Sequence, residues 1–543
     1  MNLRLTSSAL ALAAMTVPAL ADVTSEQVWQ SWVDYYASAG YQVKEGNRAK
    51  AGDTLTISDL TITAASTGEA KGTLTINVPT VDLTDLGDGK VRTVYADKVT
   101  ASIAGADKDG KPFSTDLAVD IPGNSTITSG APEDMTHTFD YPTLDLSVAK
   151  VVADGKERPL PIRLSTQNTT GSMHRVTDAA AKYTYDMKTE KAVITADITD
   201  IEGKPGDNFK FDGTMTGLES SGTMSMPKDA NIGADLNAAL KSGMSLDGTV
   251  KVGGTSGTFE LASTGDDGKA QTGSGKYDTK AFDLSMSMSQ DGLTYQGNSD
   301  AVAVELTTSD MPFPIKYATE NASFDIQMPV MKAEAPQPFK VAYSLGGLTL
   351  GEEIWGLFDP QAKLKRDPAS MDLDLTGLMQ INQDLFDQAA AAAMPAAEPA
   401  AESATGEAAE GEAAEGADAA TPAPAPAPAP AAEPIIPTEV TINQFALSLL
   451  GASMTAEGAL KAAEGADIAT APPVGQIKAE FNGVNGLLDT LGGMGVIPAD
   501  QVTGVRMMLG LFTKPGAEGE DKLTTDLEFK EGGTVFANGQ QVR

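Results

Sequence analysis

The stretch TLTISDLTIT, from Thr54 to Thr63, determines the fold class because apolar and polar residues alternate along it. A period of two places the apolar side chains of a strand on one face. The alternation slips once, since Leu55 and Ile57 are followed by Leu60 and Ile62. One extra residue, a β-bulge, returns the apolar side chains to the same face and bends the strand. The stretch therefore predicts a bulged strand in a curved sheet whose apolar side faces inward.

The same slip occurs again far along the chain, in EVTINQFALS from Glu439 to Ser448. In both places a glycine, Gly72 or Gly458, opens the next strand. This repeat predicts that the C-terminal part of the chain returns to the same sheet. The candidate apolar face consists of Leu55, Ile57, Leu60, Ile62, Val440, Ile442, Phe445 and Leu447.

Period-two alternation and glycine-rich turns dominate the chain from about Leu55 to Leu306. Asp-Gly pairs, typical of tight hairpin turns, occur at Asp88-Gly89, Asp247-Gly248 and Asp291-Gly292 among other places. Helical crossovers are missing from this pattern, which excludes a doubly wound α/β fold. We expect a mainly β protein with one long curved antiparallel sheet of hairpins and meanders, forming either an open groove or a closed core.

Three helices are expected in addition to the strands. DVTSEQVWQSWVDYYASAGYQV is amphipathic, with a capping box at Thr24 and Gln27 and a stop at Gly40, and should plug one end of the sheet. GLLDTLGGMG, residues 486–495, predicts a short helix that ends at glycines. A further helix should start near Pro498, and we expect its apolar face to pack in the core rather than to form an adaptable ligand surface. That face consists of Met507, Met508, Leu509, Leu511 and Phe512.

The organisation of the chain follows from composition. Residues 1–21 have the basic start, apolar run and small-residue cleavage site of a secretory signal peptide, with cleavage between Ala21 and Asp22. Residues 22–388 form the helix and the β-rich region. Residues 389–434 are an Ala/Glu/Pro-rich segment expected to be a disordered tether, and residues 435–543 form the C-terminal β and helical region. We expect a periplasmic protein with no transmembrane span in the mature chain.

The charge balance restricts the partners. Lys and Arg number 39 and Asp and Glu 74, giving a formal charge of −35, which disfavours nucleic acid as a partner. The chain has no cysteine and two histidines, His137 and His174, each without a second ligand at metal-binding spacing. No metal, cofactor or catalytic residue is predicted.

Three motif-like stretches fail on spacing or residue type. GDDGKAQTGSGKYD has Ala270 where a phosphate-binding loop needs glycine, and Tyr277 where it needs Ser or Thr. The segment beginning at Asp107 has no terminal glutamate of a calcium loop. Glu352 and Glu353 are adjacent and therefore point in different directions. Each is better explained as a turn or a solvated surface.

Several segments together resemble a known family: QVWQSWVDYYASAGYQV, LGGLTLGEEIWGLFDPQAKLKRDPASMDLDLTGL, VTINQFALSLLGASMTAEGAL and GVRMMLGLFTKPGAEGEDKLTTDLEFKEGGTVFANGQQVR. They resemble the family catalogued as domain of unknown function 2125, DUF2125. That resemblance implies the Gram-negative cell envelope and no known activity. A fainter resemblance is to AsmA-like envelope proteins, which implies a long twisted sheet with an apolar groove that contacts lipid.

The sequence thus predicts a secreted, non-enzymatic envelope protein that holds a lipid or another apolar ligand in a β groove. The alternative is a structural or scaffolding envelope protein with a closed β core and no ligand, whose partner would be another envelope protein. A hydrolase would need a cluster of polar side chains that the sequence does not display.

Overall fold

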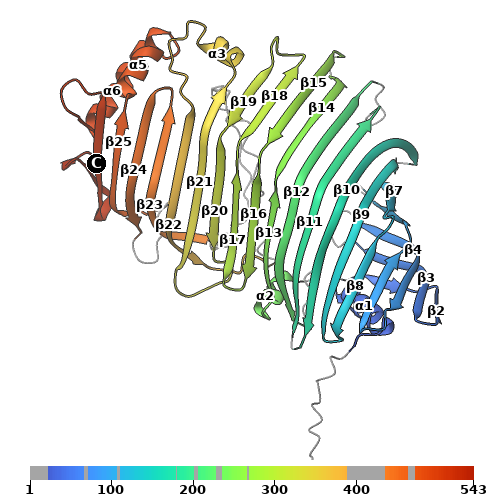
Figure 1. Ribbon diagram of the computed structural model, residues 1–543. Helices are drawn as coiled ribbons and strands as arrows, with labels where there is room; N and C mark the ends of the chain where they lie inside the picture. Colours follow the sequence, from blue (N-terminus) through green and yellow to red (C-terminus); the bar gives the residue numbers. More distant parts are fainter. Residues whose placement is uncertain are drawn as a thin grey trace, which may run out of the picture.

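The computed structural model describes residues 22–38, 40–65, 71–106, 110–153, 155–178, 180–200, 206–227, 235–265, 268–387, 435–462 and 471–543. The predicted signal peptide and the predicted tether lie outside these described residues. The strands of the described part belong to one sheet, in which each strand pairs antiparallel with neighbours. Figure 1 shows this sheet as a single curved layer.

The N-terminal end of the sheet combines one helix with strands of 3 to 20 residues. The helix is α1 (Ser25–Ser38). The strands are β1 (Gln42–Lys44), β2 (Asn47–Ala51), β3 (Thr54–Ala65), β4 (Lys71–Asp85), β5 (Lys90–Tyr95), β6 (Lys98–Ala106), β7 (Pro112–Asp120), β8 (Ser125–Ala131) and β9 (Asp134–Ala153).

Through the middle of the sheet, long strands come first, strands broken into two parts follow, and one more long strand comes last. They are β10 (Lys156–Thr177), β11 (Ala180–Ile198), β12 (Asn208–Pro227), β13 (Ser245–Val252), β14 (Gly254–Thr264), β15 (Ala270–Thr279), β16 (Phe282–Ser289), β17 (Gly292–Ser299), β18 (Val302–Thr308), β19 (Ile315–Thr319), β20 (Asn321–Met328) and β21 (Gln337–Leu350). The short helices α2 (Leu236–Lys241) and α3 (Glu352–Phe358) lie at opposite edges of this part (Figure 1).

The C-terminal part continues the same sheet, because β23 pairs with β22 along most of its length. Its strands are β22 (Ala369–Ile381), β23 (Ile435–Leu449), β24 (Ala452–Lys461), β25 (Val474–Asn482), β26 (Lys514–Pro515), β27 (Lys522–Lys530), β28 (Thr534–Ala537) and β29 (Gln540–Gln541), with the 3-10 helix η2 (Glu531–Gly533) before β28. The helices α5 (Val484–Gly493) and α6 (Ala499–Phe512) lie at this end (Figure 1).

The topology is a meander in which some consecutive or neighbouring strands lie end to end and together form one line across the sheet. We call such a line a composite strand. β13 and β14 follow each other through Gly253 and both pair with β12. β15 and β16 likewise form one line against β14 and β13, and the same holds for β17 with β18 and for β19 with β20. Each composite strand therefore neighbours the strands before and after it in the chain, as expected from local hairpins.

A line of backbone irregularities crosses the middle of these strands. Asp59 and Asn168 have a φ of 52°, Gly217 of 60° and Gly347 of 66°, all in the left-handed region. We call this line the crease and define it by these four residues. Such a conformation favours glycine, asparagine and aspartate, which explains the residue types found there. The crease is where the apolar alternation slips by one residue.

The prediction that a β-bulge causes the slip between Thr54 and Thr63 is wrong. Ser58 pairs with Thr80 and Leu60 with Val78, so β3 has no extra residue relative to β4. The left-handed Asp59 turns the strand instead. In β23 the predicted bulge is present, because Ile442 pairs with Gly458 and Phe445 with Ala456, leaving two residues opposite one.

The larger closed core lies at the N-terminal end, under α1, and a smaller buried cluster around α2 packs against Met288. Val28 and Trp29 of α1 are 0% and 1% exposed and pack with apolar residues of β3, β4 and β5. The predicted capping box is confirmed: the backbone N–H of Thr24 donates to Oε1 of Gln27 at 3.0 Å, and that of Gln27 donates to Oγ1 of Thr24 at 3.3 Å. The aromatic helix thus closes one end of the sheet.

Two other sequence predictions need correction. Asp247-Gly248 lies inside β13, where Gly248 pairs with Gly222, and does not form a turn. The apolar face of α6 does not pack in a core: Met507, Met508 and Leu511 are 73%, 63% and 59% exposed. Helical periodicity identified the helix, but the surface against which it packs depends on elements distant in sequence.

Candidate functional site

The main candidate site is one face of the sheet between β9 and β23. Residues directly opposite each other in a ladder point to the same face of a sheet, so the strand pairings identify rows of side chains that cross it. We call three neighbouring rows the apolar face. The central row is His137, Met173, Tyr185, Gly222, Gly248, Met286, Tyr295, Ile326, Val341, Leu375 and Ile442.

The rows on either side have the same character. One is Phe139, Gly171, Met187, Ser220, Val250, Leu284, Gly297, Phe324, Tyr343, Leu373 and Phe445. The other is Met135, Arg175, Tyr183, Met224, Leu246, Met288, Leu293 and Met328. At ~4.8 Å per step, the strands from β9 to β23 span about 50 Å along these rows.

Aromatic rings lie over glycines on this face. A Cβ added at Gly297 would be 2.5 Å from Cε1 of Phe324, and one at Gly171 would be 2.6 Å from Cζ of Phe139. The hydroxyl of Tyr185 lies 2.8 Å from a Cβ position at Gly222. Each glycine thus makes room for a ring from the next strand. The face is consequently smooth, with rings lying along it rather than projecting from it.

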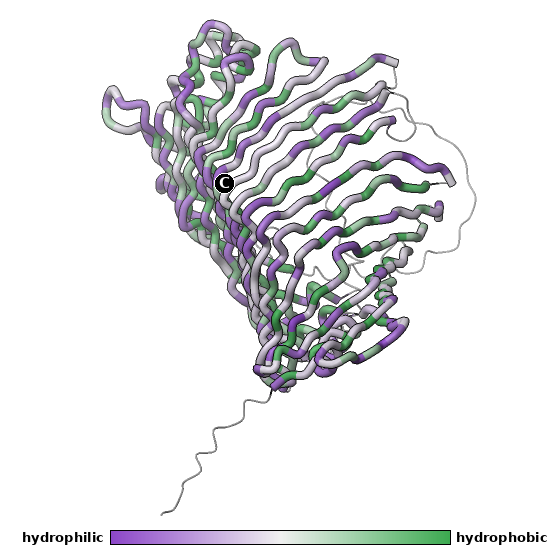
Figure 2. Tube along the Cα trace, turned by 45° about the vertical axis from the view of Figure 1, so that its right-hand side comes forward, coloured by the Kyte–Doolittle hydropathy of each residue, from purple (hydrophilic) through white to green (hydrophobic). Residues whose placement is uncertain are grey.

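The opposite face of the same strands is polar. Asn298 donates from Nδ2 to Oδ2 of Asp283 at 3.1 Å, and Lys340 pairs with Asp325 at 2.9 Å. Lys188 pairs with Glu219 across β11 and β12 at 2.9 Å. Figure 2 shows the resulting alternation of hydrophobic and hydrophilic residues along the strands. Such a sheet is expected to bury its apolar side and to solvate the other.

The apolar face is nevertheless accessible along its middle. Val250, Tyr295 and Tyr343 are 42%, 39% and 37% exposed, and Met187 and Val341 are 37% and 36% exposed. Figure 1 shows no second layer of described elements over this part of the sheet. An apolar surface of this extent on a protein usually marks a site of interaction with an apolar partner.

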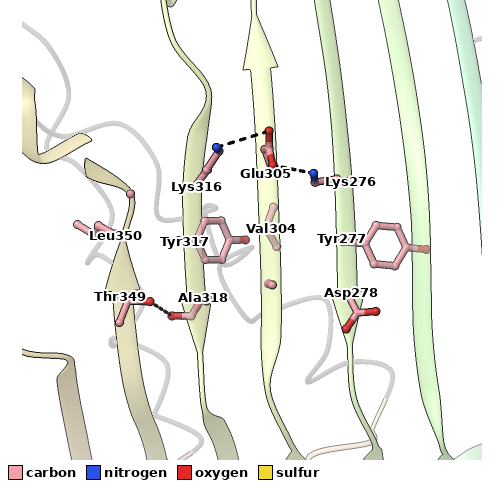
Figure 3. A pocket seen from close by; sticks show the side chains of 12 residues that line it. Lys276, Tyr277, Asp278, Val304, Glu305, Lys316, Tyr317, Ala318, Thr349 and Leu350 are labelled. Carbon is pink, nitrogen blue, oxygen red and sulfur yellow. Dashed lines mark hydrogen bonds and ion pairs between the residues drawn. The ribbon is translucent and has the colours of Figure 1, made fainter. Parts of the chain in front are cut away.

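A shallow hollow lies beside this face, on the other side of the crease. Tyr277, Val304, Tyr317 and Leu350 cross it in one row, from β15 to β21 (Figure 3). The adjacent residue of each of the first three strands points to the opposite face, where Glu305 lies 2.8 Å from Lys276 and 3.9 Å from Lys316. The division into an apolar and a charged face therefore continues across the crease.

The structure divides the predicted apolar-face residues into two groups. Leu55, Ile57, Leu60 and Ile62 are at most 4% exposed and belong to the closed core with α1. Val440, Ile442, Phe445 and Leu447 instead lie at the far end of the accessible face, where Leu447 is 36% exposed. Of the predicted cleavage residues, Ala21 lies outside the described residues and Asp22 is exposed.

The two histidines have different environments. His137 is 2% exposed, shares a 2.8 Å hydrogen bond with Oγ1 of Thr128, and lies 4.7 Å from the ring of Trp32 between centroids. Burial, reinforced by the positive charge of Arg175, lowers the pKa of His137 from 6.5 to about 4. The ring of His137 is accordingly neutral near pH 7. His174 is instead exposed and lies 2.6 Å from Asp134.

The other candidates have structural partners. Glu352 pairs with Arg366, whose guanidinium also lies 5.3 Å above the ring of Trp355. Within the described ranges, no group of three or more His, Asp or Glu side chains could hold a metal ion. None of the described helices has the length and apolar content that a transmembrane span requires.

The comparison with known families agrees with the sequence resemblance. A family model described as "Uncharacterized protein conserved in bacteria (DUF2125)" matches residues 259–538, more than half of the chain. The chain belongs to this family. Within the described part, the DUF2125 match runs from β14 to just beyond β28 and leaves α1 and β1 to β13 outside it. No curated protein and no solved structure matches the chain, and the AsmA-like resemblance stays a prediction.

Sequence reasoning missed most of the apolar face. It identified alternation in single strands, but not which strands lie side by side. The slip common to many strands, for example between Leu218 and Met215 in β12, could have been used to align them. The same alignment would have singled out Arg175 as the one charged position in its row.

Proposed function

We propose that this protein is a non-enzymatic envelope protein that holds a lipid, or another elongated apolar ligand, along its apolar face. The observation that carries the proposal is the accessible, uncharged middle of that face, with Val250, Tyr295 and Tyr343 more than a third exposed. Apolar groups left in water are unfavourable by about 25 cal/mol per Å². Acyl chains laid along the rows would remove this cost.

Several features support a lipid in preference to a closed scaffold. The glycine and ring pattern provides a smooth surface for a flexible chain. Methionines at Met173, Met187 and Met286 can adapt to ligands of different shape. The three rows hold one serine, Ser220, and no Asp, Glu, Lys or Cys, which supports a role in binding rather than catalysis.

We also propose that the protein acts in the periplasm after cleavage of a signal peptide. The support is the pattern of residues 1–21 and the small residues before Asp22. N-terminal sequencing of protein from the producing cells should begin at Asp22. Recovery of the intact N-terminus in the membrane fraction would refute cleavage.

The test of lipid binding compares adjacent residues of β13 on opposite faces. Val250→Asp places a carboxylate on the apolar face, whereas Thr249→Asp places one on the polar face next to it. Native mass spectrometry of gently purified protein should show lipid on the wild type and on Thr249→Asp, and none on Val250→Asp. Circular dichroism should show that all three are folded.

Two outcomes would overturn the proposal. The first is a wild-type protein that carries no lipid and takes up none from phospholipid vesicles. The second is equal lipid retention by Val250→Asp. Either result would favour the scaffolding alternative.

A further inference from the structure

Arg175 is the one formally charged residue in the three rows of the apolar face. It lies in β10 between Met135 of β9 and Tyr183 of β11. Its own strand places Met173 on the same face, two residues away. A guanidinium in this setting loses hydration, and a buried charge without a partner is costly.

Arg175 has no partner among the described residues. No carboxylate of the described part forms an ion pair with it, and its Nε atom is buried without a hydrogen-bond acceptor. Arg366 also has a buried Nε without a partner, but its terminal nitrogens contact Glu352 and the carbonyl oxygen of Asp359, whereas no described acceptor contacts those of Arg175. The free hydrogen-bonding capacity of Arg175 therefore needs an acceptor from elsewhere.

Other unused donors lie around the same place. Nε1 of Trp32 and Oγ1 of Thr177 are buried without a hydrogen-bond partner in the described part. Trp32 lies against His137, which is a row neighbour of Met173, and Tyr35 lies 5.8 Å from Tyr183. Two aromatic residues of α1 thus contact residues of the rows that contain or adjoin Arg175.

Arg175 lies at the boundary between the covered and the accessible parts of the apolar face. Arg175 lies where the cover provided by α1 ends, since Tyr183 is 6% exposed while Met187, farther along β11, is 37% exposed. A ligand on the accessible face would reach this place with one of its ends. The end that fits here is polar and anionic, because the free groups are a guanidinium, an indole N–H and a hydroxyl, each of which can donate a hydrogen bond.

We propose that Arg175 binds the phosphate or carboxylate head group of an anionic amphiphile whose acyl chain lies along the apolar face. The planar guanidinium can donate two parallel hydrogen bonds to either group, which a lysine could not do. This contact would fix the direction of the ligand, with its head at the α1 end. The inference rests on the proposed function and adds the head group and the orientation.

The test uses two probes with the same chain: palmitoyl lysophosphatidic acid, which carries a phosphate, and monopalmitoylglycerol, which does not. Binding is measured by isothermal titration calorimetry below the critical micelle concentration. Hydrogen bonds to a charged group contribute about 1.5–3 kcal/mol, so the wild type should bind the phosphate probe at least about tenfold more tightly. Arg175→Met should abolish this preference and keep the affinity for monopalmitoylglycerol.

Lys182→Met is the matched control. It removes one positive charge from the neighbouring strand, where Lys182 is exposed and pairs with Val176 beside Arg175. Because Lys182 lies on the polar face, this variant should keep the preference. A preference lost equally in both variants would indicate a general charge effect and overturn the assignment.

The remaining outcomes separate the two proposals. If the wild type binds both probes equally, the head-group site is wrong and the apolar groove stands. If it binds neither, the proposed function fails. Inorganic phosphate should not displace the phosphate probe at matched concentration, and displacement would mean that the site recognises free phosphate rather than an amphiphile.

Discussion

The contrast between the closed and the accessible ends of the sheet can be tested with one type of substitution. Leu60 in β3 and Leu447 in β23 are both leucines that follow the slip in their strands. Leu60 is 1% exposed inside the core with α1, whereas Leu447 is 36% exposed. Leu60→Ala and Leu447→Ala remove the same atoms from these two environments.

The expected costs follow from burial. A leucine truncated in a packed core costs about 2–5 kcal/mol, because a cavity adds to the loss of hydrophobic transfer energy. We expect about 3 kcal/mol for Leu60→Ala. Full burial of a leucine contributes about 1.5–3 kcal/mol, and Leu447 lacks part of this burial and leaves no closed cavity. Its truncation should cost about 1 kcal/mol.

The assay is urea unfolding followed by far-UV circular dichroism, together with amide hydrogen exchange of peptides from β3–β4 and from β22–β24. Exchange is needed because a chain of this length can unfold in steps. Leu60→Ala should accelerate exchange in β3–β4, and Leu447→Ala should have a small effect in β22–β24. Equal costs at the two sites would refute the reasoning, because they would mean that the face at β23 is covered.

Three further predictions concern single residues. The pKa of His137 is 6.5 in the unfolded chain and about 4 in the folded protein, so the unfolded state takes up the proton at higher pH. The free energy of unfolding should therefore fall by up to about 3 kcal/mol as the pH falls from 6.5 to 4. His137→Gln should flatten this part of the pH profile of the urea midpoint. Asp59→Val should lower the melting temperature, since a β-branched residue at a φ of 52° costs about 1–3 kcal/mol, while Asp59→Gly should not. Met507→Lys should leave the melting temperature nearly unchanged, within about 0.5 kcal/mol, because the side chain is 73% exposed, and a loss of several degrees would show that α6 packs against something.

Much of the fold could be predicted from local pattern. Alternation gives the strands because one face of each strand is apolar, and the Thr24–Gln27 capping box fixes the start of α1 by hydrogen bonds within one turn. The slips at Asp59 and Asn443 were both visible in the sequence. Their mechanisms were not, because a left-handed residue and an extra residue produce the same spacing of apolar positions.

The candidate site was harder to predict, since it depends on pairing between strands. Alternation shows that Val250 and Leu60 each lie on an apolar side, but it does not show whether anything covers that side. The isolation of Arg175 is likewise invisible in sequence, where Lys182 and Lys188 follow it closely. It becomes apparent when the strand pairings place those lysines on the other face.

The meander has a consequence for how the length of such a protein can change. Each composite strand from β9 to β25 pairs only with the strands next to it in the chain, so an inserted or deleted hairpin alters two strand junctions and leaves the pairing of the other strands unchanged. Each added hairpin would extend the rows by about 10 Å. The number of hairpins therefore determines the length of the apolar face and the size of molecule that it accommodates. Duplication of one hairpin would lengthen this face while α1 and its strands remain unchanged at one end.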